Sequence, residues 1–241
     1  MKNLIYLISI LLLIACNKPK PRIAVVEEEN LTQTQIDSIL DEYNFQYSEL
    51  TFIDSTSQVL LPITTQKQNN RKRYSSYEDE GYPRYWNILF YDSETQKTNL
   101  LTESKFRIAN FRANIINSGP ILENKILYEI GDTDYNNDGR YNYKDPLHLF
   151  VSETNGRELL RLSPLNEDLE MYQIIPNTDK IIFRTIRDVD KDLDFDKEDE
   201  IIWYQIDLSK KDAAFEIIKP SDRKLIENLY FQQWLLKNNK S

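Results

Sequence analysis

The sequence has almost none of the residues that build disulfides, zinc sites and thiol nucleophiles. Cys16 is the only cysteine and His148 the only histidine among 241 residues. A single cysteine cannot form an internal disulfide, and one histidine excludes a histidine-rich zinc site. His148 alternates with Leu147 and Leu149 in a strand-like segment, so we expect a packed or surface residue and not a catalytic base.

Glycine and positive charge are also scarce. Only five glycines occur, and the chain has neither a phosphate-cradling glycine-rich loop nor a G-x-S-x-G nucleophile motif. The 30 Lys and Arg residues are outnumbered by 39 Asp and Glu, giving a net charge of −9. A nucleic-acid-binding surface requires the opposite sign, and the short basic run "RKR" at 71–73 is typical of a solvated loop. We therefore exclude nucleic acid as a partner.

The N-terminus carries an export signal. Lys2 precedes an apolar run over 4–15, which is too short for a comfortable membrane span and is typical of a signal peptide. The run ends in "LIAC", which resembles the lipobox of bacterial lipoproteins. The resemblance implies a cleaved signal peptide over 1–15 and a diacylated, palmitate-type lipid on Cys16. It places the protein in the bacterial cell envelope, and we expect the outer membrane. An ordinary secretory signal and a membrane anchor remain the alternatives.

The rest of the chain predicts an all-β domain between two helices. Residues 16–30 are poor in apolar side chains and are expected to be a tether. Helical spacing then predicts a short helix over 31–44, and a second helix over 221–237 after Pro220, with Ser221 as its N-cap. Such a helix could cover an open sheet edge. Between them, alternation predicts twelve strands, which begin with "SELTFID", "QVLLPITTQ", "WNILFYD" and "NLLTE" and end with "KIIFRTIRD", "IIWYQIDL" and "FEIIKP".

These strands form three groups of four, at about 45–102, 106–163 and 168–220. Overlaying the third strand of each group makes Phe90, Phe150 and Tyr204 correspond. Four antiparallel strands at such a period resemble the blades of TolB-like and WD-repeat-like β-propellers. Closed propellers have about four to eight blades, so three imply an open or incomplete propeller. The alternatives are a ring completed by another chain and a plain β-sandwich.

A calcium-loop pattern begins at residue 134, in "DYNNDGRYNYKD". Counting Asp134 as position 1, oxygen-bearing side chains fall at positions 1, 3, 5, 9 and 12, which are Asp134, Asn136, Asp138, Asn142 and Asp145. Arg140 offers its backbone carbonyl at position 7, and Gly139 permits a sharp turn at position 6. This spacing is that of an EF-hand-type loop, so we predict a Ca²⁺ site in this first acidic loop (134–145).

A second copy, "DVDKDLDFDKED", forms the second acidic loop (188–199). Its oxygen-bearing side chains at positions 1, 3, 5, 9 and 12 are Asp188, Asp190, Asp192, Asp196 and Asp199, and Asp194 stands at position 7. Leu193 replaces the glycine at position 6, so either its backbone is strained or the loop opens differently. Both loops occupy the same slot, between the second and third strands of their groups. We therefore predict one or two bound Ca²⁺ ions, against the alternative of hydrated acidic turns.

A third candidate site is aromatic. The stretch before the third strand of the first group contains Tyr82, Tyr85 and Trp86, which could stack on a protein or glycan partner or could simply belong to the core. The sequence thus predicts a calcium-binding, non-enzymatic binding or scaffold lipoprotein. The alternative is an extracytoplasmic glycan or peptide hydrolase with acidic residues in a cleft between the repeats.

Overall fold

The computed structural model describes residues 31–67, 84–210 and 212–236. The chain divides into two compact units, 1–38 and 39–241. The described residues of the first unit are 31–38, most of which belong to helix α1 (Gln33–Leu40). This helix is started by Thr32, whose backbone N–H and hydroxyl both donate to Gln35 Oε1, at 2.8 and 2.9 Å, as in a capping box. The expected signal peptide and tether lie outside the described residues.

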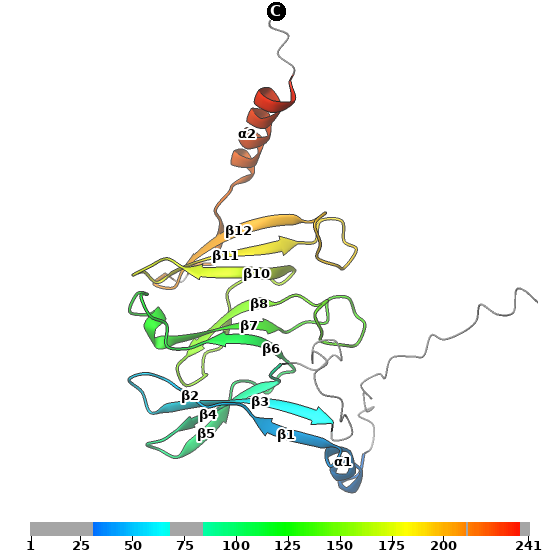
Figure 1. The fold of residues 1–241 in the computed structure, drawn as a ribbon, viewed down its shortest axis with the longest axis vertical. Coiled ribbons are helices and arrows are strands. Elements are labelled where there is room, and N and C mark those ends of the chain that lie inside the picture. Colours follow the sequence, from blue (N-terminus) through cyan, green and yellow to red (C-terminus); the bar gives the residue numbers. More distant parts are fainter. Residues whose placement is uncertain (1–30, 68–83, 211, 237–241) are drawn as a thin grey trace, which may run out of the picture. The chain divides into compact units, whose positions relative to one another are not determined.

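The second unit is built from three antiparallel sheets (Figure 1). The first sheet has the order β1 (Tyr43–Tyr47), β3 (Gln58–Lys67), β4 (Asn87–Asp92) and β5 (Lys97–Leu100), and the short β2 (Thr51–Phe52) also pairs with β3. The second sheet consists of β6 (Arg107–Arg112), β7 (Lys125–Gly131), β8 (His148–Glu153) and β9 (Leu160–Arg161). The third consists of β10 (Glu167–Ile174), β11 (Lys180–Arg187), β12 (Glu200–Asp207) and β13 (Phe215–Glu216). The all-β class and the three antiparallel sheets are confirmed, although the first sheet has five strands and not the four expected.

One strand was missed by the sequence reasoning. We expected helix to continue to residue 44, but α1 ends at Leu40 and β1 begins at Tyr43. The alternation of Tyr43, Phe45 and Tyr47 fits a strand, and β1 pairs with β3 from Tyr43 opposite Lys67 to Tyr47 opposite Ile63. The first sheet therefore begins with β1, and the predicted strand "SELTFID" is reduced to the short β2.

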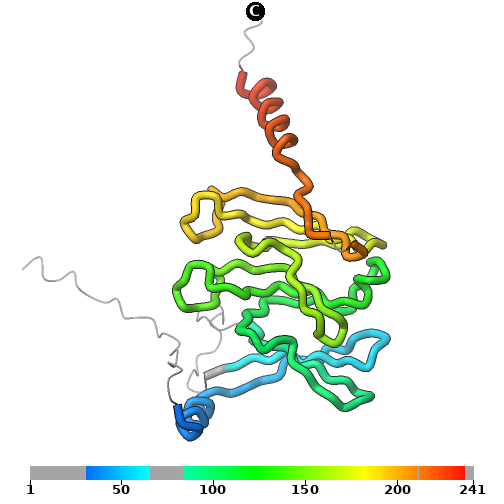
Figure 2. Tube along the Cα trace, turned by 180° about the vertical axis from the view of Figure 1, so that it is seen from behind, coloured from blue at the N-terminus to red at the C-terminus, as the bar shows by residue number. Residues whose placement is uncertain are grey.

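The sheets stack face to face, with the second sheet in the middle (Figures 1 and 2). One apolar core lies between the first and second sheets and contains Leu60, Ile88, Phe90, Ile126, Tyr128 and Phe150. Another lies between the second and third sheets and contains Leu127, Leu149, Val151, Ile181, Phe183 and Tyr204. Strand β7 reads as the nearly continuous apolar run "ILYEI" because both of its faces are covered.

The residue overlay of the repeats needs one correction. Phe90 belongs to the core between the first and second sheets, so it faces the following sheet. Phe150 and Tyr204 face the preceding sheet. A shift of one residue along a strand reverses the face, and the pairing of β4 with β5 and of β8 with β9 makes Val151, which faces the following sheet, the structural counterpart of Phe90.

Turns of one sheet also contact the neighbouring sheet. Gly156, with a φ of 77°, lies so close to Phe90 that an added Cβ would come within 2.3 Å of the ring. Asp179 Oδ1 of the third sheet accepts the backbone N–H groups of Ile121 and Leu122, both at 2.9 Å, and thereby holds the 3₁₀-helix η2 (Leu122–Asn124) of the second. These contacts fix the sheets relative to one another at the ends opposite the acidic loops (Figure 1).

Helix α2 (Pro220–Tyr230) continues into the π-helical η3 (Phe231–Leu235). Its N-cap is Lys219, whose N–H donates to Asp222 Oδ2 at 3.2 Å, so the prediction of Ser221 as N-cap was wrong. Within these two described elements no side chain is buried, so α2 does not cover a sheet as expected. Among the described residues, no helix has the length and apolar character needed to cross a membrane.

Candidate metal centre

The two acidic loops occupy equivalent places in adjacent sheets. The first connects β7 to β8, the second connects β11 to β12, and both project from the same side of the stack (Figure 1). Because both are hairpin connections between central strands, their ends are fixed by the sheets. The corresponding connection of the first sheet, from β3 to β4, falls mostly outside the described residues.

In the first acidic loop, backbone donors gather the acidic side chains around one turn. Asp134 Oδ2 at position 1 accepts the N–H of Gly139 at position 6, at 2.8 Å. The Asp138 N–H donates to Asn136 Oδ1 at 3.0 Å, and the Arg140 N–H donates to Asp138 Oδ1 at 2.9 Å. Positions 1, 3 and 5 are thus oriented by the loop backbone itself.

The second acidic loop repeats these hydrogen bonds position by position. Asp188 Oδ2 accepts the Leu193 N–H at 3.2 Å. The Asp192 N–H donates to Asp190 Oδ1 at 3.2 Å, and the Asp194 N–H donates to Asp192 Oδ1 at 2.9 Å. One carboxylate oxygen from each of Asp188, Asp190 and Asp192 lies within 4.8 Å of the others, a spacing that could hold a metal ion.

Leu193 follows the same backbone path as the glycine it replaces. Its φ is 68°, compared with 80° for Gly139. Position 4 is also left-handed in both loops, with φ of 55° at Asn137 and 63° at Lys191. A left-handed conformation costs a non-glycine residue roughly 1–2 kcal/mol. The loop therefore keeps its shape and strains Leu193, which is the first of the two outcomes we expected.

Position 12 closes each loop from within. Asp145, which is 2% exposed, accepts the Tyr135 N–H on Oδ1 at 2.9 Å and the Asn142 N–H on Oδ2 at 2.8 Å. Asp199 accepts the N–H groups of Val189 and Asp196 in the same way, at 2.9 and 3.1 Å. Each carboxylate oxygen keeps a second lone pair, so this structural role is compatible with the predicted role as a metal ligand.

The negatively charged carboxylates in the first acidic loop repel one another. Burial raises the pKa of Asp145, and the negative charges of Asp134 and Asp138 raise it further, against the lowering effect of its two backbone hydrogen bonds. Position 9 is held by the backbone two residues later: Asn142 Oδ1 accepts the Lys144 N–H at 2.9 Å, and Asp196 Oδ1 accepts the Glu198 N–H at 2.7 Å. A cation among these oxygens would offset the repulsion.

A buried ion cluster fixes the base of the first acidic loop. Asp132 follows β7 and His148 begins β8, and His148 Nδ1 lies 2.6 Å from Asp132 Oδ1. His148 Nε2 lies 2.7 Å from the Leu165 carbonyl oxygen, and Arg161 Nη1 donates to Asp132 Oδ2 at 2.8 Å. His148 is fully buried, with oxygen acceptors at both ring nitrogens, as expected of a packed residue.

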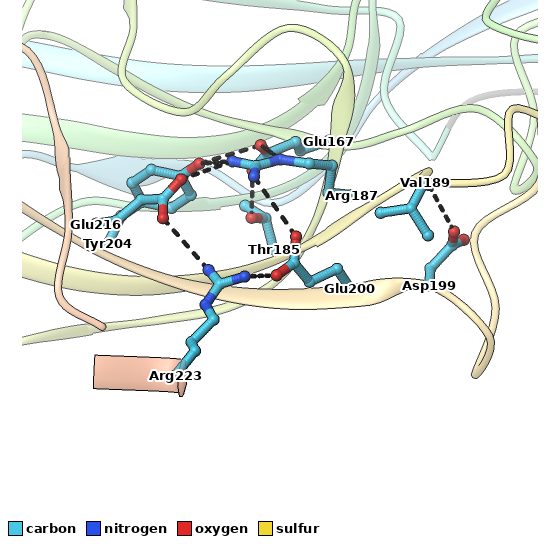
Figure 3. Close-up of polar contacts among 9 residues, drawn as sticks. All are labelled: Glu167, Thr185, Arg187, Val189, Asp199, Glu200, Tyr204, Glu216 and Arg223. Atoms are coloured by element: carbon cyan, nitrogen blue, oxygen red, sulfur yellow. Dashed lines mark hydrogen bonds and ion pairs between the residues drawn. The ribbon is translucent and has the colours of Figure 1, made fainter. Parts of the chain in front are cut away.

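A second ion network fixes the base of the second acidic loop (Figure 3). Its centre is the Glu167 carboxylate, and this residue is 4% exposed. The carboxylate accepts hydrogen bonds from Arg187 Nε at 2.7 Å and from the Thr185 hydroxyl at 2.6 Å. Arg187 directly precedes the loop and also donates to Tyr204 Oη at 2.7 Å. Burial and then the Glu167 charge raise the pKa of Tyr204 to about 12, so this phenol remains a donor and an acceptor.

The same network reaches helix α2. Arg223 pairs with Glu200, the residue directly after the loop, and its Nη2 lies 3.3 Å from Glu216 Oε2 (Figure 3). Sequence reasoning missed both ion clusters because their members are far apart in sequence and share no spacing. The one available signal was an ionisable residue at or next to each strand end that adjoins a loop.

The two described aromatic candidates, Tyr85 and Trp86, pack against different partners. Tyr85 packs against the core between the first and second sheets and meets the Phe111 ring at a centroid distance of 6.1 Å. Trp86 instead meets Phe45 of β1, also at 6.1 Å. Tyr82 and the lipidation candidate Cys16 lie outside the described residues. The described pair therefore contributes to packing at two different places.

No protein-family model matches this chain, and no curated protein matches its sequence.

Proposed function

We propose that this protein is a calcium-binding lipoprotein of the bacterial cell envelope that serves as a non-enzymatic binding or scaffold module. The observation that carries the metal part of the proposal is the equivalence of the two acidic loops. They share the hydrogen bonds of positions 1, 3, 5, 9 and 12, and Leu193 takes a left-handed backbone so that the second loop keeps the shape of the first. Two unrelated acidic turns would not need this agreement.

The donor set favours calcium over other cations. Every side chain at the ligand positions of both loops offers oxygen, supplemented by the backbone carbonyls of Arg140 and Asp194 at position 7. Oxygen-only sites suit hard cations, and a flexible loop with many oxygens suits Ca²⁺ better than Mg²⁺, which requires a strict octahedron. A bound ion would neutralise carboxylates that otherwise repel one another.

The expected lipid attachment and the arrangement of the sheets support the other parts of the proposal. The sequence around Cys16 supports a lipid anchor in the envelope, with the outer membrane as its expected site. The meander order of the second and third sheets and the face-to-face packing of the sheets support three propeller-like blades in an open stack. Such a stack would offer its outer faces and loops to a protein or glycan partner.

The hydrolase alternative has no supporting observation among the described residues. Their buried carboxylates are engaged by the protein itself: Asp132 by His148 and Arg161, Glu167 by Arg187, and Asp168 by the Leu147 N–H at 2.7 Å. A glycosidase needs two carboxyl groups that face a substrate cleft. We therefore favour the binding role.

A calcium titration of thermal stability tests the metal part of the proposal. Ligand at one hundred times its Kd adds about 2.7 kcal/mol, which corresponds to a rise in Tm of roughly 5–10 °C for a domain of this size. We expect Asp134→Ala and Asp188→Ala each to lose part of the rise and the double variant to lose all of it. Asp212→Ala, which removes an exposed acid outside both loops, is the control. An unchanged Tm of the wild type in millimolar calcium would refute the proposal.

A further inference from the structure

The two acidic loops touch each other through one side chain. Tyr135, at position 2 of the first loop, donates its hydroxyl to Asp188 Oδ2 of the second at 3.0 Å. Its ring lies against Phe195, with centroids 5.0 Å apart and planes inclined by 33°. Tyr135 thus joins position 1 of the second loop by a hydrogen bond and position 8 by ring packing.

Tyr135 is also fixed from within its own loop. It directly follows Asp134, and its backbone N–H donates to Asp145 Oδ1 at 2.9 Å. These neighbours are the first and last ligand positions of the first acidic loop. A change that orders Asp134 and Asp145 therefore orders Tyr135 as well.

The acceptor of the hydroxyl is a ligand position of the other loop. The Asp188 carboxylate is also held by the backbone N–H groups of Lys191 and Leu193, at 2.5 and 3.2 Å. The Tyr135 hydroxyl supplies a further donor that sets the direction of this carboxylate.

Of the two acidic loops, only the first has a hydroxyl at position 2 to make this contact. The residue equivalent to Tyr135 in the second loop is Val189, which is 49% exposed and has no hydroxyl to donate. A groove of about 560 Å³ beside the contact is lined by Tyr135 from the first loop and by Asp188, Lys191 and Leu193 from the second. The two loops therefore form one contiguous region, although they belong to different sheets.

We propose that Tyr135 couples the two acidic loops, so that a Ca²⁺ ion bound in the first raises the affinity of the second. This inference rests on the proposed calcium function. An ion in the first loop fixes Asp134 and Asp145, which fixes Tyr135 and pre-positions the Asp188 carboxylate. The second ion then loses less conformational entropy on binding. Linkage requires the same factor in the reverse direction.

Electrostatics opposes this coupling. Neutralising carboxylates in the first loop weakens the attraction of the region for a second cation. Salt at 0.15 M screens this effect between exposed charges more than about 8 Å apart, whereas the Tyr135 contact acts at hydrogen-bond range. The titration is therefore made at 0.15 M salt, where we expect the contact to dominate.

The test is isothermal titration of the full-length protein with CaCl₂. We expect two ions to bind with a Hill coefficient above 1 in the wild type. Asp134→Ala, which removes a ligand of the first loop, should weaken the second site by about five- to tenfold, within the usual range of coupling between sites. Tyr135→Phe keeps the ring but removes the hydroxyl, and should weaken the second site similarly while both ions still bind.

Tyr141→Phe is the matched control. Tyr141 stands at position 8 of the same loop, and its ring lies 4.3 Å from Lys105 Nζ. We expect this variant to bind both ions as the wild type does. Two ions that bind independently in the wild type, with no loss at the second site in Asp134→Ala, would overturn the coupling and leave the proposed function standing. An absence of calcium binding in the wild type would overturn both. The Asp134→Ala comparison decides the coupling even if Tyr135→Phe does not fold.

Discussion

Leu193 shows how strongly the loop shape is specified at the level of single residues. Its backbone φ of 68° lies in the left-handed region, and its side chain is 39% exposed, so packing alone does not hold it there. The N–H of Leu193 donates to Asp188, and the carboxylate of Asp199 closes the loop behind it. These hydrogen bonds impose the conformation that glycine would adopt without strain.

Leu193→Gly should therefore stabilise the protein by about 0.5–1 kcal/mol, since relief of the left-handed strain exceeds the entropy that glycine adds to the unfolded chain. Gly139→Ala at the equivalent position should destabilise it by a similar amount. An added Cβ at Gly139 meets no atom within 4 Å, so this variant reports on the backbone alone. Urea denaturation without calcium measures both changes. Shifts of the same sign would contradict the equivalence of the two loops.

At the scale of secondary-structure elements, each acidic loop is fixed by ions at the strand ends that flank it. Asp132 directly follows β7, His148 begins β8, and Arg161 comes from β9. Burial by itself raises the pKa of Asp132, but the hydrogen bond and charge of His148 and the charge of Arg161 outweigh it, so the pKa is lowered. An acid whose pKa is lower in the folded than in the unfolded state stabilises the fold above its unfolded pKa.

The lowered pKa of Asp132 predicts how the stability of the Asp132→Asn variant depends on pH. We expect the variant to lose about 1–3 kcal/mol at pH 7, because Arg161 and the buried His148 lose a charged partner. The stability contributed by the ionised Asp132 is lost from the wild type as pH falls below about 4, so the difference between the two proteins should narrow there. Guanidinium denaturation at pH 7, 4 and 3 measures this difference. Glu49→Gln, which removes an exposed acid, should show no such trend.

At the scale of the whole molecule, the second sheet contributes to both apolar cores because both of its faces are buried. Leu127, which is fully buried, faces the third sheet, while its neighbours Ile126 and Tyr128 face the first. Tyr128 keeps its hydroxyl satisfied by Ser152 Oγ at 2.7 Å, so this core contains a paired polar group. Loss of packing in this sheet would affect both cores.

Leu127→Ala should destabilise the fold by about 2–5 kcal/mol through the lost burial and the cavity it leaves. Leu100→Ala, at a side chain that is 43% exposed on β5, should cost much less. Thermal and urea denaturation measure both variants. Equal losses of stability in the two variants would mean that the buried middle sheet contributes no more than the exposed edge strand, which would contradict this packing.

The sequence could predict the features that depend on local pattern. Alternation identified the strands of all three sheets except β1, and the spacing of Asp134, Asn136 and Asp138 located the first acidic loop and its copy. It missed β1, because Tyr43 continues both a helical and an alternating pattern. It also aligned Phe90 with Phe150, because a pattern of aromatic residues does not specify which face of a sheet they occupy.

The tertiary structure decided what depends on residues far apart in the chain. The ion clusters of Asp132, His148 and Arg161 and of Glu167, Arg187 and Arg223 form only when hairpins and sheets pack together. The contact of Tyr135 with Asp188 likewise spans 53 residues between two sheets. The sequence alone determined the strands and the two oxygen-rich loops, since both follow from local spacing. Only the stacking of the sheets determined that those loops meet, because it places the same hairpin connection of adjacent sheets side by side.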